Sequence, residues 1–301
     1  MIKKVPIPMA GLSLGFAALC NLLQSYSETI RLVCGAISAV LAILFLCKCI
    51  FHFDMAKEDM KNPVMASVSG TFSMAVILLS AYAKPFIGDG AVYIWYFGIA
   101  LHVLLMVYFT ARFLYKLNMK AVFASYYIVY VGIVTASVTA PAFGRTALGL
   151  GIFWFGLVCC LILLVLVTAR YVKYREIAEP ARPLFCIYTA PVSLCLAGYL
   201  QSAETKSVSM VILLMVLAGI LYVTVLVYLP RFLALPFYPS YAAFTFPVVI
   251  SAIAMKMSTG FLAKVGYAVG ILPVIVLAET VIAVCLVVYV FIRYMKFFFS
   301  K

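Results

Sequence analysis

Long apolar runs alternate with short polar or proline-bearing loops along the whole chain. A helix of roughly 20 apolar residues spans the hydrocarbon core of a bilayer, and ten runs come close to this length. They cover residues 6–24, 30–52, 63–83, 91–114, 121–141, 146–171, 183–202, 207–229, 239–257 and 262–292. The loops between them are too short to form a soluble domain. The pattern therefore predicts an all-α integral membrane protein in which residues 1–301 form a single transmembrane domain with ten transmembrane helices.

The ten runs pair into five helical-hairpin repeats. The first helix of each pair, an odd-numbered one, opens with spacings of 55, 61, 59 and 56 residues at Pro8, Pro63, about Ala124, Pro183 and Pro239. Because each pair crosses the membrane twice, the five odd helices all start on the same side and the repeats are parallel. Many carriers instead use inverted repeats. That arrangement would pair the first run with 146–171, which lacks the proline-led pattern.

The odd helices align with one another from their opening prolines. The aligned positions are Thr189, Ala190 and Pro191 in the seventh helix, Thr245, Phe246 and Pro247 in the ninth, Ser69 and Gly70 in the third, and Gly15 in the first. On the fifth helix the match is either Val131 or Gly132. We expect the aligned residues to lie at one level of a ring of helices.

Composition separates the odd helices from the even ones. The even helices are dominated by Leu, Val, Ile and Phe, which suits contact with lipid, whereas the odd helices are rich in Gly, Ala, Ser and Thr. Small and hydroxylated residues permit close helix–helix contacts, and tight packing alone would explain them. Pro191 and Pro247 favour a pore, because each removes a helix hydrogen bond and the freed carbonyl needs a partner such as water. We therefore expect the odd helices to form an inner ring around a pore and the even helices to lie outside.

One position in this alignment stands out by its size. Gly15, Gly70 and Ala190 carry almost no side chain, whereas Phe246 carries a large ring. If these residues share one level, Phe246 fills the axis that the other three leave open. The alignment thus predicts an occluding gate at Phe246. The alternative is that Phe246 packs outward between helices.

The distribution of charged residues indicates how the chain is oriented in the membrane. Only 10% of the residues are charged, the net charge is +13, and 67% of the residues are hydrophobic. Sixteen Lys and Arg residues, from Lys3 to Lys301, fall on the side of the termini, and six fall on the other side. By the positive-inside rule both termini are cytoplasmic. The excess of positive charge then favours anionic membrane lipid as a partner and gives no reason to expect nucleic-acid binding.

The chain offers little chemistry of the catalytic kind. It has no phosphate loop, no zinc-binding or hydrolase motif, and nine cysteines that lie mostly in apolar runs, so we expect no enzyme activity, no cofactor and no metal. His102 is expected to be a hydrogen-bonded packing residue. Glu279 lies inside the tenth run and is a candidate for proton coupling, or else a structural residue at a helix contact.

The odd helices also constrain the ion. None carries a charged residue in its central third, and a dicarboxylate site would need Arg or Lys. An uncharged pore suits small monovalent inorganic anions such as chloride and nitrate, to which Ser69, Thr189 and Thr245 could donate hydrogen bonds. Cation passage would call for a ring of carboxylates.

Two motifs resemble a known family. The stretch 244–252, Phe-Thr-Phe-Pro-Val-Val-Ile-Ser-Ala, and the opening 6–18, with the ten-span layout, resemble the tellurite-resistance/dicarboxylate transporter family. Its members include bacterial TehA and the plant guard-cell slow anion channels. The resemblance implies a homotrimer in the inner (plasma) membrane of a bacterium, with one five-helix pore per protomer and a phenylalanine plug that falls on Phe246. A proton-coupled carrier or exporter of tellurite or C4-dicarboxylates is the alternative.

Overall fold

The computed structural model describes residues 2–299 and is helical throughout, with no strand among these residues. Lys301, one of the basic residues counted above, lies outside them. The long helices are α1 (Met9–Leu23), α2 (Glu28–Phe51), α4 (Pro63–Ile87), α5 (Ala91–Phe109, continued by a π-helical turn Thr110–Leu114), α8 (Thr146–Lys173), α9 (Ala190–Ser202), α10 (Val208–Leu233), α11 (Phe246–Lys264) and α12 (Leu272–Phe299). The short ones are α3 (Phe53–Asp59), α6 (Tyr126–Tyr130) and α7 (Thr135–Thr139).

Helical segments occur at each of the ten predicted runs, but the last boundary differs. The tenth run was expected from residue 262, whereas α11 continues to Lys264 and α12 begins only at Leu272. Gly266 and Gly270 in the connection adopt φ angles of +86° and +44°, a conformation that favours glycine and ends the helix. The apolar residues before Gly266 therefore extend the ninth segment instead of starting the tenth.

Within residues 2–299, seven helical stretches are long and apolar enough to cross a membrane. They are Glu28–Phe51, Pro63–Leu114, Thr146–Lys173, Glu179–Ser202, Val208–Leu233, Pro239–Lys264 and Leu272–Phe299. Pro63–Leu114 contains both α4 and α5, and two shorter apolar stretches, Met9–Leu23 and Gly132–Phe143, accompany the seven. The chain is therefore a multi-pass membrane protein, and the count of ten crossings stays a prediction.

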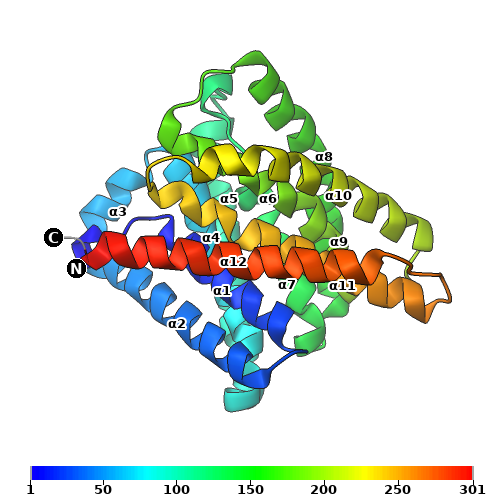
Figure 1. The fold of residues 1–301 in the computed structure, drawn as a ribbon. Helices are drawn as coiled ribbons and strands as arrows, with labels where there is room; N and C mark the ends of the chain where they lie inside the picture. The colour runs from blue at the N-terminus through cyan, green and yellow to red at the C-terminus, as the bar shows by residue number, and fades with distance from the viewer. Residues whose placement is uncertain (1, 300–301) are drawn as a thin grey trace.

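Five segments contact one another in a closed cycle. Helix α1 packs against α4, α4 against α6 and α7, α7 against α9, α9 against α11, and α11 against α1 again. Figure 1 places the labels of these helices in the middle of the molecule, with α2, α3, α8 and α10 around them and α12 across the front. The start of the chain and the end of α12 lie at the same end of the molecule, as an even number of crossings requires.

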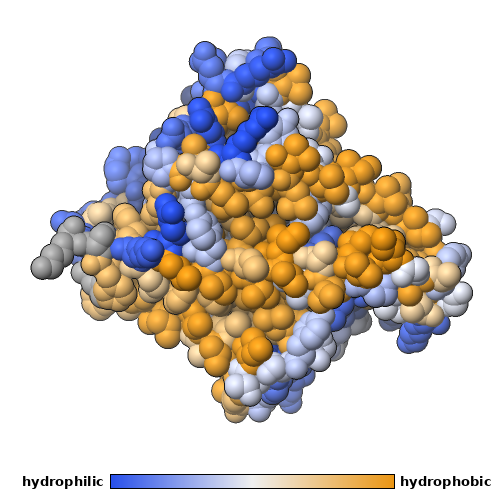
Figure 2. Space-filling model, in the orientation of Figure 1, coloured by the Kyte–Doolittle hydropathy of each residue, from blue (hydrophilic) through white to orange (hydrophobic). Residues whose placement is uncertain are grey.

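Burial distinguishes this cycle from the helices around it. In the most apolar 18-residue window of each inner segment, 94% of the residues of Glu179–Ser202 and 61% of those of Pro239–Lys264 are buried. In the corresponding windows of the outer helices, only 28% of the residues of Val208–Leu233 and 33% of those of Thr146–Lys173 are buried. The outer helices carry exposed large apolar side chains, such as Val165 on α8 and Val227 on α10. Figure 2 shows the resulting hydrophobic surface over α10 and α12, with hydrophilic residues gathered near the termini and at the top of the view. Such an apolar belt is what lipid contact requires.

Three of the five inner segments contain 3₁₀ breaks, whereas α1 and α4 are continuous, as are the outer helices α2, α8, α10 and α12. The 3₁₀ helix Glu179–Thr189 precedes α9, and the 3₁₀ helix Pro239–Phe244 precedes α11. Two further 3₁₀ turns, Gly132–Val134 and Ala140–Phe143, interrupt the segment that contains α6 and α7. The breaks before α9 and α11 and the turn Gly132–Val134 lie inside their segments, whereas Ala140–Phe143 ends its segment.

The prolines of the alignment lie at these breaks. Pro191 and Pro247 are each the second residue of their α-helix, α9 and α11. First-turn N–H groups have no partner within the helix, so a proline there costs no hydrogen bond. The argument that these two prolines free a carbonyl inside a helix is therefore corrected: they start a helix, and the case for a pore rests on other features.

Candidate functional site

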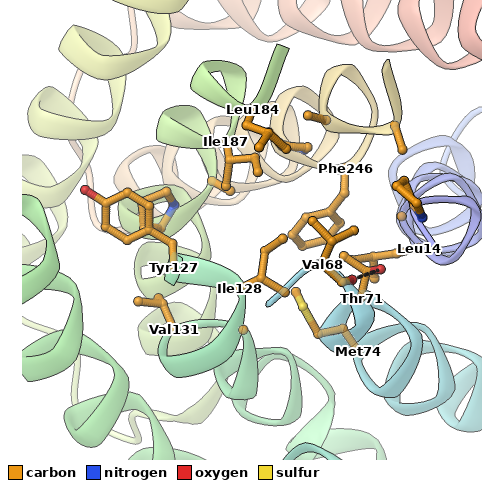
Figure 3. A pocket seen from close by; sticks show the side chains of 18 of the residues that line it. Leu14, Val68, Thr71, Met74, Tyr127, Ile128, Val131, Leu184, Ile187 and Phe246 are labelled. Carbon is orange, nitrogen blue, oxygen red and sulfur yellow. Dashed lines mark hydrogen bonds between the residues drawn. The ribbon is translucent and has the colours of Figure 1, made fainter. Parts of the chain in front are cut away.

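The closed cycle of helices surrounds a central cavity of about 50 Å³, large enough for a few water molecules. Figure 3 shows Phe246 in the midst of the residues around it, with Leu14, Val68 and Thr71 on one side and Ile128 and Ile187 on the other. The lining residues are Pro8, Gly11, Leu14, Val68, Thr71, Met74, Tyr127, Ile128, Val131, Gly132, Leu184, Ile187, Ala190, Pro191, Leu194, Ser240, Ala242, Ala243, Phe246 and Pro247. All five inner segments contribute.

The cavity surface is almost entirely apolar. None of the described residues that line it is charged. The Thr71 hydroxyl donates to the carbonyl of Val68 at 2.7 Å, and the Tyr127 hydroxyl donates to the carbonyl of Leu163 at 3.3 Å. The Ser240 hydroxyl is buried without a hydrogen-bond partner among the described atoms. Ser240 is thus the group in this lining whose hydroxyl is free to serve a ligand.

A second cavity lies beyond Phe246. It has a volume of about 490 Å³ and is lined at the far ends of the inner segments by residues that include Asn21, Tyr82, Gln201 and Lys256. Two of the described residues, Phe246 and Leu194, line both cavities. Phe246 is 5% exposed and lies at the first position of α11. Phe246 therefore borders both spaces.

Phe246 is held in place by close contact between α1 and α11. A Cβ atom on Gly15 would come within 2.6 Å of the Cβ of Thr245 and 3.3 Å of the backbone nitrogen of Phe246. The Thr245 hydroxyl donates to the carbonyls of Ala242, at 2.7 Å, and Gly11, at 3.2 Å. Gly15 and Thr245 thus serve helix packing behind Phe246, and neither lines the cavity.

The other aligned residues also fall into two groups, those that line the central cavity and those that do not. Gly70 faces outward, since a Cβ there would lie 2.8 Å from the side chain of Leu105 on α5. Ser69 lines a separate pocket, and its hydroxyl donates to the carbonyl of Ala66 at 2.7 Å. Thr189 is buried and donates to the carbonyl of Cys186. Ala190, Pro191 and Pro247 line the central cavity beside Phe246.

A rotation along the helix explains the misplaced residues. The cavity-lining stripes are Pro8, Gly11 and Leu14 on the first segment and Val68, Thr71 and Met74 on α4. Successive residues of an α-helix point about 100° apart, so a position one residue away leaves the axis. The expectation that Gly15 and Gly70 face the axis is corrected to their neighbours Leu14 and Thr71. On the fifth segment both candidates, Val131 and Gly132, line the cavity.

His102 and Glu279 lie outside the cavity lining. His102 is fully buried between helices, with Nδ1 2.8 Å from the Ser73 hydroxyl and Nε2 3.0 Å from the Val129 carbonyl, which confirms it as a hydrogen-bonded packing residue. Glu279 on α12 is 4% exposed and interacts with Ser251 on α11 and Tyr222 on α10. One of its carboxylate oxygens has no hydrogen-bond partner among the described atoms.

Residues 2–299 contain no group of three or more His, Cys, Asp or Glu side chains that could hold a metal ion. The central feature is a small cavity without charged residues in its described lining, enclosed by a ring of buried helices and bordered by Phe246. Comparison with known proteins gives this feature a context. No curated protein matches the sequence. The family described as voltage-dependent anion channel, which includes TehA and the plant slow anion channels, matches residues 4–295, nearly the whole chain. The chain therefore belongs to this family of anion channels and transporters.

Proposed function

We propose that this protein is a passive channel for small monovalent anions, chloride and nitrate among them, whose pathway is closed by Phe246. The path runs through the central cavity, past Phe246 and Leu194, into the second cavity. The observation that carries the proposal is that Phe246 lines both cavities and so lies between them.

The apolar lining supports monovalent anions over dicarboxylates. An anion that enters a dry, apolar passage loses hydration energy, and without a lysine or arginine nothing compensates the second charge of a dianion. Ions that shed water easily pay the smallest penalty. Ser240, whose hydroxyl has no partner among the described atoms, is the donor that we assign to the passing ion. It replaces Ser69, Thr189 and Thr245, whose hydroxyls donate to backbone carbonyls of neighbouring residues.

The membrane topology and the oligomeric state are part of the same proposal. We infer ten crossings with cytoplasmic termini, in the plasma membrane of a bacterium, from the helix count and from the distribution of Lys and Arg. A homotrimer with one pore per protomer is proposed from family membership. Its partners are then membrane lipid and small inorganic anions, without nucleic acid.

A proton-coupled carrier of tellurite or C4-dicarboxylates is the second candidate. It is favoured by the partnerless carboxylate oxygen of Glu279, because a buried carboxyl group inside a membrane protein is a common proton carrier. Against it, Glu279 lies on an outer helix and lines neither of the two cavities. A carrier would lose pH-driven uptake in Glu279→Gln, whereas a channel would keep its anion current.

The channel is tested by truncation of the Phe246 ring. We expect Phe246→Ala, reconstituted in planar bilayers, to pass at least about ten times the chloride current of the wild type, because removal of the ring joins the two cavities. Phe261→Ala is the matched control: it lies on the same helix and lines neither cavity. A silent Phe246→Ala protein that folds and inserts normally would contradict the channel.

A further inference from the structure

The second cavity differs in chemistry from the central one. Its lining includes apolar residues near Phe246 and polar residues farther out. The polar ones are Asn21, Gln24, Arg31, Tyr82, Thr135, Thr139, Gln201 and Lys256. They come from α1, α2, α4, α7, α9 and α11, so that this space, which we call the vestibule, is the mouth of the helix ring on the side away from the termini.

One face of α11 connects the vestibule to Phe246. Phe246, Ile250, Ile253 and Lys256 line the vestibule together and recur at the helical spacing of three or four residues. Lys256 is ten residues beyond Phe246, which corresponds to about 15 Å along the helix axis. The face that directs Phe246 into the passage therefore also directs Lys256 to its outer end.

Contacts at the end of α1 hold the Lys256 ammonium in this place. Nζ donates to the carbonyl of Leu22 at 3.2 Å and to the hydroxyl of Ser25 at 2.5 Å, and it lies 4.7 Å from the centre of the Tyr26 ring. Leu22 belongs to the last turn of α1, where the helix dipole favours a cation. An ammonium group has three N–H donors, and the two hydrogen bonds use two of them. The third remains for a ligand in the vestibule.

The charge balance of the vestibule singles out the same residue. Arg31 also lines it, but the Arg31 guanidinium is bound to both carboxylate oxygens of Glu28, at 2.5–2.9 Å, and this pair adds no net charge. No carboxylate is among the described residues of the lining. The nearby amides of Asn21, Gln24 and Gln201 are neutral and can donate hydrogen bonds to a hydrated anion. Lys256 is thus the one uncompensated charge of the described lining.

We propose that Lys256 is an anion-binding residue of the vestibule that concentrates small inorganic anions at the mouth of the passage before they lose their water. A single charge in a concave, low-dielectric space focuses its field on that space and raises the local concentration of counter-ions. This inference rests on the proposed function for its consequence in conduction, whereas anion binding at Lys256 does not depend on it.

The competing explanation is that Lys256 only caps the end of α1. The two roles respond differently to salt. The field of a partly exposed charge extends about 30 Å at 0.01 M ionic strength and about 3 Å at 1 M. Loss of anion attraction therefore reduces current at low salt and little at high salt. Loss of a cap lowers stability and the amount of folded protein, and its effect on current does not depend on salt.

The test uses Lys256→Gln and Lys256→Arg in the conducting Phe246→Ala protein. Lys264→Gln is the matched control, since Lys264 lies on the same helix, is exposed and lines neither cavity. We expect Lys256→Gln to reduce chloride current at least about two-fold at 0.01 M salt, with the difference lost at 1 M, while the arginine variant and the control keep the parent current. Equal currents at low salt, or an equal reduction at both salts, would overturn the proposal.

A binding measurement keeps the proposal testable if Phe246→Ala does not conduct. Purified full-length protein broadens the NMR line of chloride in proportion to bound anion. We expect Lys256→Gln to reduce this broadening relative to both the wild type and Lys264→Gln. Unchanged broadening in Lys256→Gln would rule out the site. A silent Phe246→Ala with normal loss of broadening would reject the channel and retain the anion site.

Discussion

The two cavities on either side of Phe246 are built from the same ring of helices but differ in polarity. The central cavity is small, apolar and uncharged, whereas the vestibule is about ten times larger and carries amides, hydroxyls and Lys256. The difference separates two tasks of an anion pathway. In the pathway that we propose, the vestibule attracts the hydrated ion, and the central cavity admits only ions that can lose their water.

Among the tests of this difference in polarity, a charge placed in the central cavity should have the largest effect on anion current. We expect Ala243→Asp, in the conducting Phe246→Ala protein, to reduce anion current more than about ten-fold, because a carboxylate in an apolar passage repels the ion at close range. Ala243→Asn, of similar size and uncharged, is the control and should retain most of the current. The comparison fails if both variants conduct alike.

A substitution at Gly15 tests whether this residue packs between helices or lines the pore. We expect Gly15→Ala to destabilise the protein by about 1–3 kcal/mol, because its Cβ would overlap Thr245. Thermal unfolding in detergent measures the effect. Gly151→Ala, with nothing within 4 Å of the added carbon, is the control and should be neutral. A Gly15→Ala protein with normal stability and reduced current would place Gly15 on the axis.

Ser240 should have a smaller effect. Replacement of its hydroxyl in Ser240→Ala removes the donor that we assign to the passing ion, and a typical hydrogen bond contributes about 0.5–1.5 kcal/mol. We expect a change in the nitrate-to-chloride permeability ratio of roughly two-fold, measured from reversal potentials. Thr71→Val, which alters a hydroxyl already bonded within its own helix, should leave the ratio unchanged. Equal shifts in both variants would remove Ser240 from the pathway.

Glu279→Gln should have no effect on current. Glu279 interacts with Ser251 on α11, and it lines neither cavity. Currents of the Phe246→Ala protein measured across a range of pH should be the same with glutamate or glutamine at position 279. A current that depends on pH only when Glu279 is present would favour proton coupling.

The apolar runs were sufficient to predict an all-helical membrane protein and the approximate positions of its long helices, because hydrophobic length and flanking loops determine both. The start of α12 was the exception, since the loop with Gly266 and Gly270 moves it from residue 262 to Leu272. The axis-facing residues were harder to identify. Phe246, Ala190, Pro191 and Pro247 line the cavity, but the alignment was one residue from the lining positions on α1 and α4. The hydroxyl residues of the inner helices do not mark one face, since Thr71 lines the cavity whereas Ser73 bonds to His102 away from it, so only contacts between helices determine the orientation.

The breaks in the inner segments were also not predicted from the sequence. Pro191 and Pro247 look like interior prolines in an uninterrupted apolar run, whereas the preceding residues form 3₁₀ helices and the prolines begin new α-helices. Lys256 was counted only as one of the few basic residues of the far side. Its role depends on the end of α1, which lies more than 200 residues away in the chain.

The most direct test of the account is a size series at position 246. Chloride current through reconstituted protein with Ala, Leu, Phe or Trp at this position measures how far the side chain closes the passage. The account predicts that current falls as the side chain grows, with alanine highest and both aromatic residues near zero. Currents that are independent of side-chain size in folded, inserted protein would contradict the claim that Phe246 closes an anion pathway.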